Sequence, residues 1–180
     1  MSGPRYDGVA QAMHWLMALA LVAVFAIGLW MVAQPLMVRL KTVPLHKTLG
    51  VTVFLLACLR LAWRATHPAP ALPASMPRWE RIAATAAHHL LYLLMFAVPL
   101  SGWLMSSALG FATVPFGLFR LPDLLARDRE LGDALKVVHF ALNKAFAALV
   151  LLHVAAALKH HFIDRDGVLQ RMLPGGSRRS

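Results

Sequence analysis

The stretch VVHFALNKAFAALVLLHVAAALKHH, residues 137–161, is apolar at most positions, yet it contains four histidines and two lysines. It is long enough to cross the hydrocarbon core of a bilayer, which takes about 20 helical residues. His139 and His153 stand fourteen residues apart in it. In an α-helix this interval rises about 21 Å and completes nearly four turns. The two imidazoles are therefore predicted to project from one face of a single helix at two depths.

The composition of the whole chain points to a membrane protein. Its 180 residues are 59% hydrophobic and 14% charged, with a mean hydropathy of +0.62, which is too apolar for an ordinary soluble domain. The first apolar block lacks a clear small-x-small cleavage site, so we interpret it as a retained span. We predict an all-α, integral membrane four-helix bundle forming a single domain over 1–180. The predicted spans are 14–33, 46–65, 86–108 and 137–162, with an inner loop at 66–85 and an outer loop at 109–136.

The two long loops differ in character. Residues 68–77 are rich in proline and are interpreted as an extended linker. The sequence LPDLLARDRELGDALK, residues 121–136, is predicted to form a short amphipathic helix on the membrane surface. Cys58 is the only cysteine, which excludes an internal disulfide and a cysteine metal cluster.

The charge distribution indicates an orientation. The formal net charge is +10, but the basic residues are scattered among loops, so we predict anionic lipid or a small anionic substrate as partner and no nucleic acid. The side that carries both termini holds ten Lys and Arg, against eight on the opposite side. The positive-inside rule therefore favours cytoplasmic N and C termini.

The histidines form a set that fits two haem groups. Neutral imidazole is a standard axial ligand of haem iron, and two histidines on one iron leave no open position for oxygen chemistry. By depth in the bilayer, His46 is predicted to pair with His139 near the outer face and His14 with His153 near the inner face. His88 competes with His14 for the inner position.

Small and basic residues accompany the predicted haem positions. Gly28 and Gly102 follow His14 and His88 by fourteen residues, and Gly50 lies one turn after His46. A missing side chain at these depths would let a flat macrocycle approach the backbone. Arg60 and Arg64, one turn apart near the inner end of the second span, could bind haem carboxylates. Positive-inside anchoring explains the two arginines nearly as well.

The other histidines carry weaker signals. His89 points about 100° away from His88, so at most one of the two faces the bundle. His160 and His161 are interpreted as solvated or lipid-facing at the inner interface, with quinone protonation as the alternative. His67 precedes a proline in a loop and is interpreted as a surface residue.

Several of these stretches resemble the bacterial di-haem cytochrome b-561 family over nearly the whole chain. They are QAMHWLMALALV (11–22), LHKTLGVTVFLLACLRLAWR (45–64), HHLLYLLMFAVPLSGWLM (88–105), VVHFALNKAFAALVLLHVAAALKHHF (137–162) and GVLQRMLP (167–174). The resemblance implies a bacterial inner-membrane, multi-pass protein with two haem b groups, ligated by His14, His46, His139 and His153. It also implies that His88 lies near a haem edge or a quinone. One departure is Lys144, where the family has a neutral residue. A lysine there could snorkel outward or meet a haem carboxylate.

The similarity is closest to the short members of the family that act as superoxide:ubiquinone oxidoreductases. It implies that superoxide is oxidised to oxygen at the outer face and ubiquinone is reduced to quinol, with no catalytic residue acting by covalent chemistry. The candidate superoxide-attracting residues are the outer basic side chains Arg39, Lys41, Lys47 and Lys136. Anchoring to lipid phosphates explains them equally well. The sequence gives no clear quinone pocket.

Two other classes of protein share parts of this pattern. A di-haem b anchor subunit would pass electrons from a partner dehydrogenase or hydrogenase to quinone with the same histidine spacing. A haem-free transporter or structural membrane protein would use histidines for protons or for packing. Both a homo-oligomer and an unknown redox partner are compatible with the sequence.

Overall fold

Four long helices make up most of the chain in the computed structural model, which describes residues 5–175. They are α1 (Gly8–Met31), α2 (Leu36–Thr66), α3 (Arg78–Ala108) and α4 (Arg129–Lys159). Three short turns complete the fold: η1 (Pro115–Gly117), η2 (His160–Asp164) and η3 (Leu169–Arg171). No β-strand occurs within the described residues, so the predicted all-α bundle is confirmed. Residues 1–4 and 176–180, part of the predicted domain, lie outside them.

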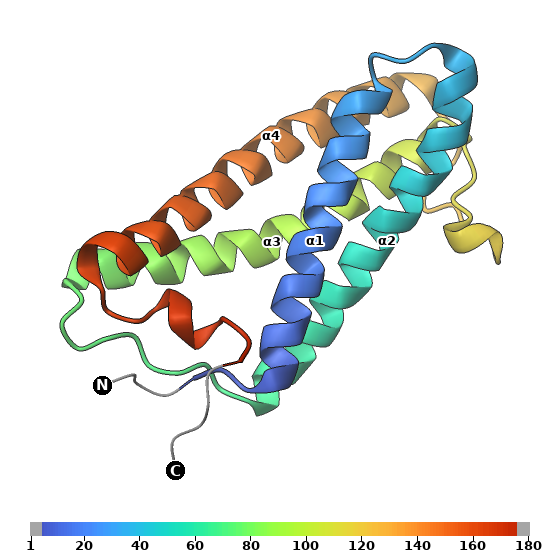
Figure 1. Cartoon of the computed structure of the whole chain (residues 1–180). Helices are drawn as coiled ribbons and strands as arrows, with labels where there is room; N and C mark the ends of the chain where they lie inside the picture. The colour runs from blue at the N-terminus through green and yellow to red at the C-terminus, as the bar shows by residue number, and fades with distance from the viewer. Residues whose placement is uncertain (1–4, 176–180) are drawn as a thin grey trace.

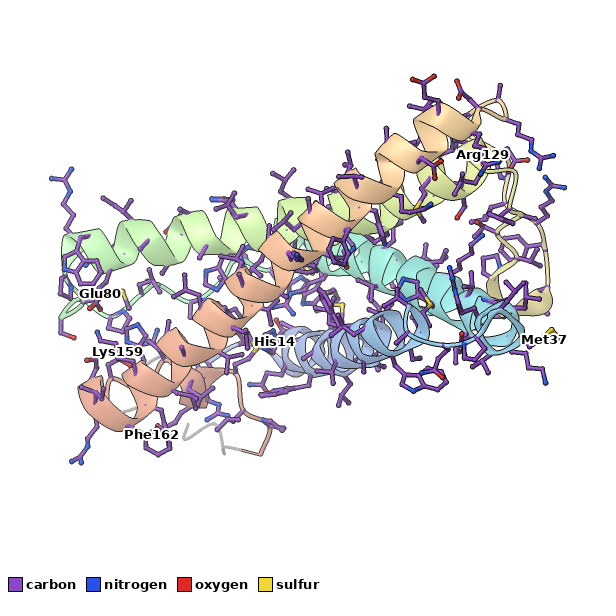
Figure 2. The ribbon with its side chains drawn as sticks, turned by 90° about the horizontal axis from the view of Figure 1, so that it is seen from above. His14, Met37, Glu80, Arg129, Lys159 and Phe162 are labelled. Atoms are coloured by element: carbon purple, nitrogen blue, oxygen red, sulfur yellow. The ribbon has the colours of Figure 1, made fainter. Side chains whose placement is uncertain are left out.

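The helices are arranged as two packed hairpins. Helix α1 packs mainly on α2 and helix α3 mainly on α4, while α2 also contacts α3 (Figure 1). Because the helices run alternately up and down, α1 begins and α4 ends at the same end of the bundle. Figure 2 shows Glu80 and Lys159 at this end, and Met37 and Arg129 at the other.

Every helix begins before its predicted apolar span. Helix α2 begins at Leu36, α3 at Arg78 and α4 at Arg129, each eight to ten residues before the predicted start. The separate surface helix predicted over 121–136 is wrong, because residues 129–136 are the first turns of α4 and the Asp128 carboxylate caps them by accepting a hydrogen bond from the Leu131 N–H at 3.0 Å. Hydropathy locates only the part of a helix that meets hydrocarbon, whereas capping decides where the helix begins.

The centre of the bundle is a small core with one buried residue from each helix. Met17, Ala57, Met95 and Phe146 pack together there. Large apolar side chains cover the outside, including Leu19, which is 69% exposed, and Leu151, which is 70% exposed. Each of the four helices is long and apolar enough to cross a membrane. A bilayer is therefore the medium that covers this surface.

The C-terminal segment folds back across the end of the bundle at which α1 begins. The Trp15 indole N–H donates to the Met172 carbonyl at 2.9 Å, and the Gln11 side-chain amide donates to the Arg171 carbonyl at 3.1 Å. The Arg171 guanidinium in turn donates to the Ala71 carbonyl in the proline-rich linker at 2.6 Å. These bonds tie the tail, the linker and α1 together beneath this end of the bundle (Figure 1).

Asp7 joins the start of α1 to the end of α2. Its carboxylate accepts the Ala10 N–H at 2.9 Å as the helix N-cap, and both of its oxygens lie 3.2 Å from the Trp63 indole nitrogen. Slight burial acts to raise the pKa of Asp7, but these hydrogen bonds outweigh it and hold the pKa below its ordinary value.

Asp7→Ala is expected to lower the free energy of unfolding by about 1 kcal/mol, since it removes an N-cap. A carboxyl with a lowered pKa stabilises the fold above its unfolded-state pKa and loses that contribution as the pH falls. Thermal unfolding in detergent at neutral pH and near pH 3 measures both effects. Asp7→Asn, which keeps a capping oxygen, is the control. A difference between Asp7→Ala and wild type that grows toward low pH would contradict the role of the carboxylate.

Candidate functional site

Two pairs of histidines face each other inside the bundle at two levels. His14 of α1 and His153 of α4 have their ring centres 6.4 Å apart, with an interplanar angle of 63°. His46 of α2 and His139 of α4 have ring centres 6.5 Å apart and ring planes at 88°. We call these the inner pair and the outer pair. Figure 2 shows His14 in the half of the molecule that also holds Lys159.

The spacing of both pairs fits a single metal ion between the two rings. A metal–nitrogen bond is about 2 Å long and the ring centre lies about 1 Å beyond the nitrogen, so two imidazoles on one iron have centres about 6 Å apart. Both observed distances agree with this value. The residues present therefore fit haem iron with two axial histidines, and the assignment of the four ligands stays a prediction.

Hydrogen bonds orient both rings of the outer pair. The Nδ1 atom of His46 lies 3.2 Å from the Val24 carbonyl oxygen, which can only accept, so Nδ1 carries the proton. The Nδ1 atom of His139 lies 2.9 Å from the Ser101 hydroxyl, whose own proton is donated to the Val98 carbonyl at 2.7 Å. Both Nε2 atoms are thereby left with a free lone pair, the form in which imidazole binds a metal.

Phe146 separates the two pairs. It lies seven residues from His139 and seven from His153 along α4, and it is 1% exposed. Its ring packs against Phe25 of α1 with ring centres 5.7 Å apart. A layer of apolar side chains thus lies between the two pairs.

Two of the three predicted glycines contact the outer pair directly. A Cβ atom built on Gly28 would lie 3.0 Å from Cε1 of His46, and one on Gly102 would lie 3.0 Å from Cε1 of His139. Side chains at these positions would push the rings out of place. Gly50 differs, since a Cβ there would meet no protein atom within 4 Å.

His88 lies at the inner level, but on α3. Its ring centre is 5.3 Å from that of His153, closer than two ligands of one iron require. The inner ring that stands at ligand distance from His153 is His14, which favours His14 over His88 as the second inner ligand. His89 is exposed, as expected for a residue turned away from the bundle.

Arg60 lies beside the inner pair. Its Nε–H donates to the Tyr92 hydroxyl at 3.1 Å, and both side chains line a small hollow of about 20 Å³ between the start of α1 and the end of α2. Arg64 is exposed, with its guanidinium carbon 6.0 Å from the centre of the Tyr92 ring. Tyr92 was missed in the sequence, although its place four residues after His88 on the same helix was a signal.

The four outer basic residues differ in how they are held. Arg39 and Lys41 are exposed on the first turns of α2. The Lys47 ammonium donates to the carbonyls of Phe111 and Ala112 at 3.1 and 3.0 Å, and Lys136 pairs with Asp133 at 2.7 Å.

Lys144 turns outward from the bundle. Its side chain is exposed, and its ammonium lies over the Phe140 ring, 4.5 Å from the ring centre. Of the two orientations considered for this lysine, the structure has the outward one.

The interpretation of His160 as a solvated or lipid-facing residue is wrong. The residue is 9% exposed, and its Nδ1 atom lies 2.7 Å from Asp166 and 3.0 Å from Asp164. Residue spacing could not predict this burial, because η2 is a single π-helical turn that redirects the chain. The Lys159 ammonium lies 2.6 Å from Glu80 and 2.9 Å from Asp164, so it forms an ion pair with each of these two carboxylates.

Comparison with known proteins identifies the family. The family model described as prokaryotic cytochrome b561 matches residues 5–175. Cytochrome b561 homolog 2 of Escherichia coli (strain K12) is 39% identical over 171 residues, covering 94% of this chain and 91% of that protein. The probable superoxide oxidase CybB of Yersinia pestis is 29% identical over 176 residues, covering 94% and 96%. Cytochrome b561 homolog 1 of E. coli (strain K12) is 29% identical over 129 residues, covering 72% and 73%.

The match extends over all four helices and includes each of the paired histidines. It agrees with a bundle that lipid must cover and with imidazole pairs at metal-ligand spacing. The chain therefore belongs to the prokaryotic cytochrome b561 family of membrane electron-transfer proteins, which bind haem b.

Proposed function

We propose that the protein is a superoxide:quinone oxidoreductase of the bacterial inner membrane, with two haem b groups held by the inner and outer histidine pairs. The observation that carries the proposal is the presence of two such pairs at two depths, with Phe146 between them. The 29% identity to a probable superoxide oxidase supports the choice of substrate. Both termini are proposed to lie in the cytoplasm.

The reaction balances two one-electron donors against one two-electron acceptor. Two superoxide ions each give up one electron and become oxygen, while one ubiquinone takes up two electrons and two protons and becomes quinol. When bound, the haem groups would supply one-electron acceptance and donation at each pair. Such outer-sphere transfer requires no covalent intermediate with the protein.

The chain's own residues hold and shield the redox groups. Ser101 and the Val24 carbonyl fix the outer imidazoles in the tautomer that can bind iron. Phe146 and its neighbours keep water out of the centre of the bundle. At the outer face, Arg39 and Lys41 are exposed and can attract an anion before it reaches the outer pair.

Superoxide-driven quinone reduction by the purified protein in neutral detergent tests the proposal. We expect a b-type reduced-minus-oxidised spectrum at two haems per chain, and quinol formation that superoxide dismutase abolishes. Electrostatic attraction should make the rate fall roughly tenfold from low to high ionic strength. Arg39→Glu with Lys41→Glu should slow it at unchanged haem content, unlike the control Arg81→Glu at the inner end. Haem-loaded protein that reduces quinone only with a partner dehydrogenase would instead indicate an anchor subunit.

A further inference from the structure

Arg60 is a cation at the level of the inner histidines. It is half-buried and bonded to Tyr92, which lies one turn after His88 on α3, and the His88 ring centre is 5.3 Å from that of His153. In the part of the chain that the structure describes, no aspartate or glutamate forms an ion pair with it. A partly buried guanidinium without a carboxylate is costly unless an anion joins it.

Tyr92 fixes the guanidinium in this position. The Arg60 Nε–H donates to the Tyr92 hydroxyl, and the Tyr92 ring packs against the central core. Of the five N–H donors of the guanidinium, this bond uses one. Among residues 5–175, the Tyr92 hydroxyl is the only hydrogen-bond partner of this guanidinium, so its other donors can bind a carboxylate through two parallel bonds.

The outer pair differs in its surroundings. Within residues 5–175, no lysine or arginine forms a hydrogen bond with His46 or His139. Lys47 follows His46 directly in the sequence, but the carbonyls of Phe111 and Ala112 hold its ammonium. The outer imidazoles instead donate Nδ1 hydrogen bonds to Val24 and Ser101.

We propose that Arg60, held by the Tyr92 hydroxyl, binds a carboxylate of the inner haem and keeps the reduction potential of that haem above the potential of the outer haem. This inference rests on the proposed function, because it requires a haem at each pair. It adds a direction to the electron transfer, from the outer face toward the inner one.

The sign of the effect follows from charge. Reduction adds one electron to the haem, and a nearby cation stabilises the added negative charge, so Arg60 raises the inner potential. At the outer pair, a hydrogen bond accepted from each Nδ1–H makes the imidazole a stronger donor to the metal. A stronger donor stabilises the oxidised iron, which lowers the outer potential. The cation at the inner pair and the hydrogen bonds at the outer pair therefore both place the inner potential above the outer one.

Redox titration of the purified protein, followed by its visible spectrum, tests the inference. His46→Ala is used to retain only the inner haem and His14→Ala only the outer one, which assigns the two potentials. We expect the inner haem to have the higher potential. Arg60→Gln should lower the inner potential toward that of the outer haem or release the inner haem alone, and Arg60→Lys should restore part of the wild-type value. Tyr92→Phe should lower the inner potential by less than Arg60→Gln.

The control is Arg81→Gln, which removes an arginine from the same end of the bundle, where its guanidinium donates to the Met76 carbonyl. It should leave both potentials unchanged. If Arg60→Gln releases both haems, the inner potential is measured in Arg60→Lys and Tyr92→Phe instead, and both variants should lower it. The inference is overturned if the inner haem has the lower potential, or if the Arg60 and Tyr92 variants titrate like wild type. A wild-type preparation without haem would contradict the proposed function itself.

Discussion

Replacing His153 or His14 with alanine is expected to reduce the haem content from two to one per chain, and both variants should lose the same haem. Their rings stand 6.4 Å apart, the spacing of two ligands on one iron, so removing either leaves one axial position without its protein ligand. Superoxide-driven quinone reduction should fall to background in both variants. Haem extraction and redox titration of the remaining absorbance band measure the loss.

His88→Ala is the matched control for the inner pair. His88 contacts His153 at 5.3 Å from a third helix, and its removal should leave both haems in place. If His88→Ala and His153→Ala deplete one haem while His14→Ala retains two, the inner ligand comes from α3 and the pairing through α1 is wrong. Loss of different haems from the His14 and His153 variants would lead to the same conclusion.

Gly102→Val is expected to remove the outer haem and to lower the haem content nearly as much as deletion of a ligand histidine does. The Cβ atom alone would lie 3.0 Å from Cε1 and 3.4 Å from Nδ1 of His139, and the branched methyl groups add further crowding. The ring cannot move away freely, because its Nδ1 atom is hydrogen-bonded to the Ser101 hydroxyl. Overpacking of this kind typically costs about 1–3 kcal/mol. The strain should displace the imidazole and leave one haem per chain.

Gly28→Val should have the same effect through His46, whose Cε1 atom also lies 3.0 Å from a Cβ built on the glycine. The control is Gly8→Val at the start of α1, where a Cβ meets no atom within 4 Å. Haem content and the two midpoint potentials are the readouts. Two haems with wild-type potentials in Gly102→Val would show that the imidazole of His139 is not confined by this contact.

The sequence predicts the depths of the paired histidines but not all of their partners. The interval from His139 to His153 fixes two depths on one helix, since rise and turn per residue are constant in an α-helix. It does not fix which other helix faces each depth, and so His14 and His88 were both candidates. That choice depends on how α1 and α3 pack beside α4, which is a tertiary property.

The hydrogen-bond partners of the site histidines could be predicted from the sequence only in part. Ser101 could have been suspected, because a ligand histidine usually donates its second nitrogen to a nearby oxygen. The Val24 carbonyl could not, since every residue has a carbonyl and the side chain gives no sign of its partner. The burial of His160 between two aspartates was hidden in the same way, because it depends on one π-helical turn.

The sequence by itself determined the all-α membrane bundle, the two levels of imidazole on α4 and the family resemblance. Apolar length and helical periodicity are local properties that need no partner segment. Only the tertiary structure set His14 at ligand distance from His153, placed Gly28 and Gly102 against the outer rings, and joined Arg60 to Tyr92. These contacts unite residues far apart in the chain, and their geometry depends on how whole helices pack.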